Sequence, residues 1–427
     1  MQRVDAGSGV DLAGLAVYQV GGSVRDQLLG LEAGDRDYVV VGSSPEDMRR
    51  RGFRPVGRDF PVFLHPETGE EYALARTERK QGRGYHGFVF HTGPEVRLED
   101  DLARRDLTIN AMAVSDQGEL IDPFNGRLDL ELGVLRHITD AFREDPVRIL
   151  RLARFATRFQ EFSIAERTVA LCRRMVADGE VDHLVPERVW QEMSRALMHD
   201  RPSRFISVLG ETGALDVVLP EIGALFGIPQ SSRHHPEIDT GRHTLMVLDR
   251  AAELGGDLPV RFAALVHDLG KARTPPDNWP AHHGHEHLGV PIIRAVCQRL
   301  RVPNACRDLA LLVGEFHLQI HRAAELKPAT LVRLLERLDL FRRPERLEPV
   351  LLACQADYTG RLGLENRPYP QADRVRQALS AAAAVDARQL VEQGLDGAAL
   401  GQALHAERVK RVRAACASGP NEVPGTG

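Results

Sequence analysis

The sequence predicts an α+β protein, in which a small N-terminal sheet with flanking helices is followed by an all-α region. From Ala16 to about Asp140, short β-type runs such as AVYQV, YVVVG and PVFLH alternate with Gly, Pro and Asp. After Glu144, long amphipathic stretches replace these runs, and β-rich segments nearly vanish. The chain has 427 residues, more than one hydrophobic core usually holds, so we expect several domains.

The composition is that of a folded protein. Hydrophobic residues make up 43% and charged residues 27% of the chain, which excludes disorder as its main state. A net charge of −5 excludes a uniformly basic nucleic-acid binder but permits a local basic cleft. The five cysteines show no paired spacing, so we expect reduced thiols. No apolar run approaches the ~18 residues of a membrane span, and we expect a cytoplasmic protein without a membrane anchor.

Breaks rich in Gly and Pro divide the helical region near residues 219–229 and 344–349. They predict four parts, which are a head at 1–142, a neck at 143–225, a body at 226–340 and a tail at 341–427. The tail contains the helical stretches LVRLLERLDLFRRPERL and HAERVKRVRAA. Their basic faces could contact RNA phosphates, although solvated charge would explain them equally well.

A Gly-Gly turn provides the first candidate site. In YQVGGSVRDQLLG, a strand meets Gly21 and Gly22 and then enters a helix. Such a turn lets backbone N–H groups approach a phosphate, and Arg25 can add a forked donor. A plain strand-to-helix turn explains this segment alone equally well.

Two acidic residues follow in GDRDYVVVG, where Asp35 and Asp37 alternate about Arg36 at the start of a strand. The period of two places both carboxylates on one face. Acids so placed can hold one or two Mg²⁺ ions, about 3.5 to 4 Å apart in two-metal sites, that bridge triphosphate oxygens. Glu71 in EEYALAR is the candidate third acid, and Glu70 is the competing register.

Five motifs now identify a family: GGSVRD, DRD, EYALARTE, RRDLTINAMA and EDPVRILRLARFATRF. In this order they resemble the class II tRNA nucleotidyltransferases and bacterial poly(A) polymerases of the polymerase β superfamily. The resemblance implies catalytic Mg²⁺ on Asp35 and Asp37, while Glu71 stays the candidate for the third catalytic acid and Glu70 its competitor. It also makes the head a nucleotidyltransferase domain and the neck its base-reading template. The segment 78–95 corresponds to a flexible loop that helps to set specificity.

The resemblance also assigns the nucleotide contacts. Residues expected to bind ATP and CTP are Gly22, Arg25, Arg105, Asp145, Arg148, Arg151 and Arg154. Within this set, Asp145 and Arg148 correspond to the pair that reads the base, and Arg151 and Arg154 to the triphosphate ligands. Helical geometry supports part of the assignment independently. At 100° per residue, the arginines of this segment fall within about 120°, while its apolar residues lie on another face.

A second constellation lies among the histidines, ten of which fall between residues 234 and 321. In FAALVHDLGKARTPP an apolar helix ends in His267 and Asp268, and His243 lies upstream. This pattern resembles an HD-superfamily phosphohydrolase domain at about residues 230–335. The resemblance implies that these three residues bind a divalent transition metal, for which Ni²⁺, Mn²⁺ and Co²⁺ are candidates. A further ligand is open among three residues, and His317 is the first choice over Asp308 and Asp357.

Together the motifs predict a bacterial class II CCA-adding enzyme. It would add and repair the 3′-terminal CCA of tRNA from CTP and ATP without a nucleic-acid template. Its HD domain would act as a phosphatase, 2′,3′-cyclic phosphodiesterase or 2′-nucleotidase. The alternatives are a poly(A) polymerase and an HD-type nucleotide hydrolase with a nucleotide-sensing head. We expect contacts with the tRNA acceptor stem and 3′ end, and either a monomer or a homo-oligomer.

Overall fold

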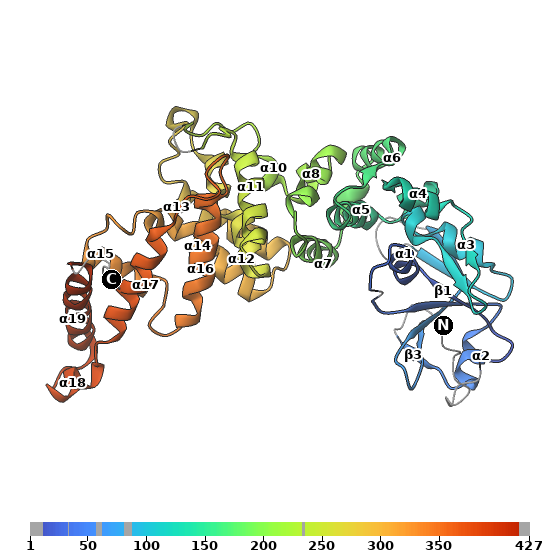
Figure 1. Cartoon of the computed structure of the whole chain (residues 1–427), viewed down its shortest axis with the longest axis horizontal. Helices are drawn as coiled ribbons and strands as arrows, with labels where there is room; N and C mark the ends of the chain where they lie inside the picture. Colours follow the sequence, from blue (N-terminus) through green and yellow to red (C-terminus); the bar gives the residue numbers. More distant parts are fainter. Residues whose placement is uncertain (1–11, 33, 57–61, 81–87, 233–234, 418–427) are drawn as a thin grey trace, which may run out of the picture. The chain divides into compact units, whose positions relative to one another are not determined.

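The computed structural model describes residues 12–32, 34–56, 62–80, 88–232 and 235–417. Its contacts divide the chain into two compact units (Figure 1). The first consists of residues 1–196 and 204–218, and the second of residues 197–203 and 219–427. The predicted α+β class is confirmed, because the strands lie in the first unit and helices make up the second. The finer division into four parts stays a prediction.

A mixed sheet forms the base of the first unit. Its seven strands lie in the order β3-β4-β5-β2-β1-β8-β9. Strand β2 pairs antiparallel with β1 and parallel with β5. The strands of the unit are β1 (Ala16–Val20), β2 (Asp37–Val41), β3 (Arg54–Val56), β4 (Val62–Leu64), β5 (Glu71–Leu74), β6 (Arg76–Lys80), β7 (Phe88–Thr92), β8 (Ala113–Ser115), β9 (Leu120–Ile121), β10 (Val134–Leu135) and β11 (Ser163–Ile164).

Alternation along β2 creates two small cores, because successive side chains of a strand point to opposite faces. Val39 packs with Val20 and Leu102 on one face. Val40 packs with Phe63 and Met48 on the other. Both valines are almost fully buried, so the register of β2 is fixed by packing and sets the position of Asp37 at its first residue.

Helices complete the first unit. They are α1 (Gly22–Leu28), α2 (Pro45–Arg50), α3 (Leu98–Ala103), α4 (Gly126–Leu132), α5 (Val147–Arg158), α6 (Glu166–Ala177), α7 (Pro186–Leu197), α8 (Ser203–Thr212) and α9 (Leu215–Val218). Helix α5 begins where the Asp145 carboxylate accepts a hydrogen bond from the Val147 N–H group at 3.1 Å. The helix presents one buried apolar face and one arginine-bearing face.

The described part of the second unit is helical and contains no strand. Its helices are α10 (Pro220–Gly223), α11 (Thr240–Glu253), α12 (Leu258–Val266), α13 (His285–Arg299), α14 (Asn304–His321), α15 (Pro328–Arg337), α16 (Leu347–Thr359), α17 (Pro370–Ala383), α18 (Ala387–Glu392) and α19 (Gly397–Ala417). Helix α12 packs against α11, α14 and α16, so its buried C-terminal end meets side chains from three helices. Within the described ranges, no helix has the length and hydropathy of a membrane span.

Candidate active sites

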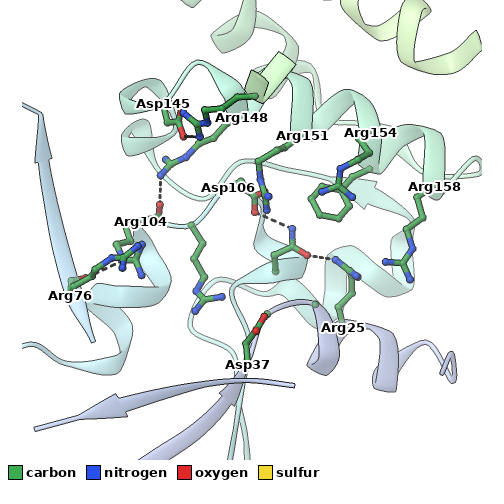
Figure 2. Close-up of a pocket in the computed structure, with 16 residues that line it drawn as sticks. Arg25, Asp37, Arg76, Arg104, Asp106, Asp145, Arg148, Arg151, Arg154 and Arg158 are labelled. Carbon is green, nitrogen blue, oxygen red and sulfur yellow. Dashed lines mark hydrogen bonds and ion pairs between the residues drawn. The ribbon is translucent and has the colours of Figure 1, made fainter. Parts of the chain in front are cut away.

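A cavity of about 550 Å³ lies in the first unit (Figure 2). Its lining includes nine arginines and three aspartates, so the cavity carries an excess of positive charge and favours an anion. The lining residues are Gly21, Gly22, Arg25, Asp37, Arg76, Arg104, Arg105, Asp106, Asn110, Asp145, Arg148, Arg151, Arg154, Phe155, Arg158 and Arg188.

Helix α5 supplies one wall of this cavity. Figure 2 shows its arginines in a row, across the cavity from Asp37 and Arg25. All four arginines that the helical spacing groups together line the cavity: Arg148, Arg151, Arg154 and Arg158. The opposite face of the helix is fully buried, with Ile149 and Leu152 at 0% exposure. The apolar face therefore anchors the helix and fixes where the guanidinium groups lie.

The Gly-Gly turn lies at the edge of the cavity. Gly21 has φ = 75°, a conformation that favours glycine, and a Cβ atom there would lie only 2.9 Å from Nη1 of Arg105. Arg25 is 3% exposed and donates to Asp26 at 2.8 and 2.9 Å and to Asn110 at 2.5 Å. The missing side chain at Gly21 thus lets Arg105 approach the backbone beside Arg25.

The acidic residues at the start of β2 occupy different environments. Asp37 is the first residue of the strand and lines the cavity, whereas Asp35 lies in an exposed bend before it. Glu71 is the register partner of Asp37 on β5, while Glu70 hydrogen-bonds the Tyr38 hydroxyl at 3.4 Å. The pairing therefore places Glu71, rather than Glu70, beside Asp37.

These three acids offer carboxylate oxygens, the ligand type that Mg²⁺ prefers. Loss of hydration raises the pKa of Asp37 above its ordinary value, and the nearby charges of Glu71 and Asp35 raise it further, against the opposing effect of Arg105. A divalent cation would relieve that repulsion. The oxygens of the three acids do not, however, lie within 4.8 Å of one another in the described structure.

A buried ion pair organises the centre of the cavity. Asp106 accepts hydrogen bonds from Arg151 at 2.7 Å, from Asn110 at 3.0 Å and from the Leu107 N–H group at 2.8 Å. Burial opposes ionisation of Asp106, but Arg151 and these hydrogen bonds outweigh it and hold its pKa well below the usual range. The carboxylate therefore stays charged and fixes the direction of Arg151.

The pair expected to read the base makes contacts that the sequence did not predict. Arg188 on α7 donates to both oxygens of Asp145, at 3.0 and 2.7 Å. Arg148 donates to the backbone carbonyls of Ala141 and Arg104, at 2.6 and 2.5 Å. Asp145 is thus held by a bidentate arginine, and two N–H groups of Arg148 are occupied by the backbone.

A second site lies at the C-terminal end of α12 in the other unit. His243 Nε2 lies 3.0 Å from Asp357 Oδ1, and His267 Nε2 lies 3.2 Å from Asp268 Oδ2. Nδ1 of His267 donates to the Ala264 carbonyl at 2.8 Å, which leaves Nε2 as an acceptor in the neutral ring. Two imidazole nitrogens and two carboxylates converge in this buried space, a donor set that suits a divalent transition metal.

A third group of ligand atoms shares Asp268. Its other oxygen, Oδ1, lies 3.1 Å from His285 Nε2 and 3.8 Å from His317 Nε2. Both rings place Nδ1 near a backbone carbonyl, of His282 at 2.9 Å and of Val313 at 3.0 Å. If each Nδ1 carries the proton, each Nε2 carries a lone pair. The two Nε2 atoms lie 3.3 Å apart, beside the Asp268 carboxylate, so these lone pairs and the carboxylate repel one another. A cation between these atoms would remove the repulsion.

Outer residues hold these ligands in place. Glu237, whose side chain is fully buried, lies 3.0 Å from His243 Nδ1. Lys271 Nζ lies 2.6 Å from Asp268. Burial opposes ionisation of Asp268, but His267 and Lys271 keep its pKa well below the usual range. Such second contacts orient metal ligands and fix the imidazole tautomer.

The structure gathers most of the predicted residues into two regions, one in each unit, but Asp35 and Glu71 do not line the cavity. His243, His267, Asp268 and His317 meet in the second unit, where Asp357 joins them and Asp308 instead pairs with Arg307. Sequence reasoning missed Arg188 and His285. The HHGHEH run contains His285, but its four histidines gave no means of choosing among them. The segment 78–95 lies partly outside the described residues, and His234 lies outside them.

Comparisons with known proteins agree with this division. Residues 17–136 match the family model for a poly A polymerase head domain, and residues 240–361 match the HD domain. Residues 161–225 match the model described as a probable RNA and SrmB-binding site of polymerase A. These matches fall on the segments that contain Asp37, the histidine cluster and Arg188, respectively.

Curated relatives match almost the whole chain. The multifunctional CCA protein of Alkalilimnicola ehrlichii is 65% identical over 402 residues, which cover 94% of this chain and 97% of that protein. The multifunctional CCA protein of Thioalkalivibrio sulfidiphilus is 61% identical over 401 residues, with 93% and 98% covered.

Solved structures show the same fold. The Bacillus stearothermophilus CCA-adding enzyme in complex with CTP has a TM-score of 0.63 at 23% identity, with 94% of this chain and 89% of that chain covered. The Thermotoga maritima CCA-adding enzyme complexed with tRNA has a TM-score of 0.62 at 20% identity, with 98% and 97% covered.

Proposed function

The chain belongs to the family of multifunctional CCA proteins, and from that premise we propose that it adds and repairs the 3′-terminal CCA of tRNA. Its substrates are CTP, ATP and the tRNA 3′ end, and it reads no nucleic-acid template. The observation that carries the proposal is the arginine-lined cavity that faces Asp37. The expectation of a cytoplasmic location is part of the same proposal.

In the head, the proposal assigns triphosphate binding to Arg25, Arg105, Arg151 and Arg154, beside the turn at Gly22. Guanidinium groups suit this role because each offers paired donors to phosphate oxygens. Mg²⁺, when bound to Asp35 and Asp37, supplies charge neutralisation and a lower pKa for the attacking 3′-hydroxyl. Glu71 supports Asp37 from the adjacent strand. The arginines meanwhile hold the α-phosphate in line with the hydroxyl and stabilise the charge on the departing pyrophosphate.

Base selection rests on Asp145 and Arg148 in this proposal. A carboxylate accepts hydrogen bonds, so Asp145 suits the exocyclic amino groups that cytosine and adenine share and that uracil lacks. Arg188 keeps this carboxylate in one orientation through its two hydrogen bonds. For Arg148 to donate to a base, at least one of its bonds to a backbone carbonyl has to open when a nucleotide enters.

In the HD domain, the proposal assigns hydrolysis of a phosphate ester, such as a 2′,3′-cyclic or 2′-phosphate at a damaged RNA end. His243, His267, Asp268 and Asp357 would hold one divalent cation, with Ni²⁺, Mn²⁺ or Co²⁺ as candidates. A cation there supplies electrostatic activation of a water nucleophile. Glu237 and Lys271 hold His243 and Asp268 in orientation. We assign His285 and His317 to a second cation that shares Asp268.

The test of transferase function uses a tRNA that ends at the discriminator base, with Mg²⁺ and with CTP and ATP singly and together. Two added residues with CTP alone, and three ending in A with both nucleotides, support the proposal. A long A tail would support the poly(A) polymerase alternative. No extension would support an HD hydrolase with a nucleotide-sensing head.

The HD activity needs a separate assay, hydrolysis of a 2′,3′-cyclic nucleotide with each candidate metal. The native protein is compared with the His267→Ala variant. We expect metal-dependent hydrolysis by the native protein only, and equal rates in both proteins would contradict the assigned site.

A further inference from the structure

One carboxylate of the histidine cluster is held by a histidine that the proposed cation site does not use. The two oxygens of Asp357, on α16, have different neighbours. Oδ1 lies 3.0 Å from His243 Nε2 and 3.8 Å from His267 Nε2. Oδ2 lies 2.6 Å from Nε2 of His321. Because His321 occupies Oδ2, Oδ1 is the oxygen that Asp357 presents to a cation bound by the other two histidines.

His321 is the last residue of α14, and its ring is largely buried, with 11% of the side chain exposed. Its Nδ1 atom lies 3.0 Å from the hydroxyl oxygen of Tyr369. An ionised carboxylate only accepts hydrogen bonds, so Nε2 of His321 carries the proton that is donated to Asp357. In the neutral ring Nδ1 is then an acceptor, and the Tyr369 hydroxyl donates to it. A chain of donors therefore runs from Tyr369 through His321 to Asp357.

Tyr369 lies beyond the match to the HD domain, which ends at residue 361. It caps the N-terminus of α17, a helix that packs against α14 and α16 (Figure 1). A second tyrosine borders the same ring, since Tyr358 lies 5.8 Å from His321 between ring centroids. Among the described residues, the Tyr358 hydroxyl has no hydrogen bond. The two tyrosines thus share the packing around His321, whereas the hydrogen bond that sets its tautomer comes from Tyr369.

Arg361, one turn further along α16, provides the other contact to this carboxylate. It donates to Asp357 Oδ1 at 3.2 Å and to the Asp357 backbone carbonyl at 3.1 Å. Each carboxylate oxygen has two lone pairs, so Oδ1 can accept from Arg361 and still bind a cation. His321 differs because it holds the oxygen that does not face His243 and His267. The direction of Oδ1 therefore depends on the bond between His321 and Oδ2.

We propose that His321 is a positioning residue of the HD centre, and that Tyr369 completes the hydrogen-bond chain that directs Asp357 Oδ1 toward the cation. The inference rests on the proposed function, which assigns a divalent cation to this cluster. Carboxylates that bind metals are themselves hydrogen-bonded, and losing such an outer partner typically lowers metal affinity about 10- to 100-fold. The HD centre then depends on a residue outside the segment that matches the HD domain.

The experiment measures binding of Co²⁺ alone to the full-length protein. Titration calorimetry gives the affinity, and the visible absorption of bound Co²⁺ reports its coordination. The variants are His321→Leu, which removes the donor, His321→Gln, which keeps an N–H group at a similar reach, and Tyr369→Phe. Tyr358→Phe is the matched control, because it removes a hydroxyl from the same aromatic group. His267→Ala identifies the cation in question, and circular dichroism checks that each variant keeps its helices.

We expect His321→Leu to weaken the cation that His267→Ala loses by about 10- to 100-fold and to change its absorption. His321→Gln should bind Co²⁺ within about threefold of the native protein, because its amide can donate to Oδ2. Tyr369→Phe should weaken binding about 2- to 10-fold, as the loss of one hydrogen bond implies. Tyr358→Phe should bind as the native protein does.

Native affinity and absorption in His321→Leu would overturn the proposal. Equal losses in Tyr358→Phe and Tyr369→Phe would do the same, as would a loss in His321→Gln as large as in His321→Leu, because packing would then explain the effect. His267→Ala separates this inference from the proposed function. If it binds Co²⁺ like the native protein, the assigned HD site fails. If it loses Co²⁺ while His321→Leu does not, the HD site stands and only the role of His321 fails.

Discussion

The arginine-lined cavity and the histidine cluster are chemical opposites within one chain. The cavity is lined by nine arginines and three aspartates, and several of the arginines are held in place by a carboxylate, as Arg151 is by Asp106 and Arg188 by Asp145. The cluster consists of buried acceptor atoms, and the imidazole nitrogens lie 3.0 to 3.9 Å from the nearby carboxylate oxygens. A donor-rich site selects an anion, and an acceptor-rich site selects a cation.

Both proposed reactions act on phosphates, but they differ in whether protein side chains or bound cations contact the phosphate oxygens. In the reaction proposed for the head, arginine side chains would bind the phosphate oxygens, and cations would bind at Asp37 and its neighbours. In the reaction proposed for the HD domain, histidines and aspartates would hold cations, and the cations would contact the phosphate. Variants that remove one donor set should therefore leave the other reaction intact.

The largest expected effect is that of Asp37→Asn. The amide has nearly the shape of the carboxylate but no charge, so it loses the cation with little change in packing. We expect CMP and AMP incorporation to fall by at least about 10³-fold, as the loss of several kcal/mol of charge stabilisation requires. Primer extension on tRNA measures this loss, and HD hydrolysis at the native rate provides the control.

The reciprocal change, Asp268→Asn, should lower the rate of HD hydrolysis at least about 100-fold. Asp268 belongs both to the group with His243 and His267 and to the group with His285 and His317. Metal content after dialysis, measured by mass spectrometry, should fall in parallel. CCA addition should continue at the native rate. Hydrolysis that survives in Asp268→Asn would show that the cluster is not the hydrolytic site.

A smaller effect is expected for Arg188→Leu, which leaves Asp145 without its bidentate partner. The Asp145 carboxylate would then adopt several orientations, and discrimination of CTP from UTP should fall about 5- to 20-fold, or about 1 to 2 kcal/mol. Competition between the four nucleotides measures this ratio. The matched control is Arg143→Leu, which removes the exposed pair with Asp178 and should leave selectivity unchanged.

The last prediction concerns stability and its pH dependence, with no expected change in which reaction each region performs. The pKa of Asp106 is depressed in the folded state, so its charge stabilises the fold above the ordinary pKa near 3.8, and that stability is lost as the pH falls through the native value. Asp106→Asn should lower the free energy of unfolding of the head by about 3 kcal/mol at pH 7. Denaturant unfolding should show this difference shrinking progressively below about pH 5. A constant difference from pH 7 to pH 3 would contradict the ion pair.

Local periodicity explains which parts could be predicted from the sequence. The 3.6-residue repeat identified the arginine face of α5, and the contrast between β-type and helical runs identified the α+β class. Partners that lie far apart in the chain could not be found this way. Arg188 is 43 residues from Asp145, and Asp357 is 114 residues from His243, so only the packed helices bring them together.

Strand register shows a second limit. Glu70 and Glu71 are adjacent, and one residue of slip exchanges their faces, so composition alone could not choose between them. The parallel pairing of β2 with β5 puts Glu71 opposite Asp37. The start of β2 had a similar uncertainty, since Asp35 was expected in the strand and lies in the bend before it.

The most direct test of the contrast between the two regions is one crystal structure of the protein with CTP and Mn²⁺, with anomalous scattering from the metal. We expect the triphosphate to lie along Arg25, Arg151 and Arg154, and we expect two anomalous peaks about 3.5 to 4 Å apart around Asp268. A triphosphate bound away from the α5 arginines, or no anomalous peak at Asp268, would contradict this expectation.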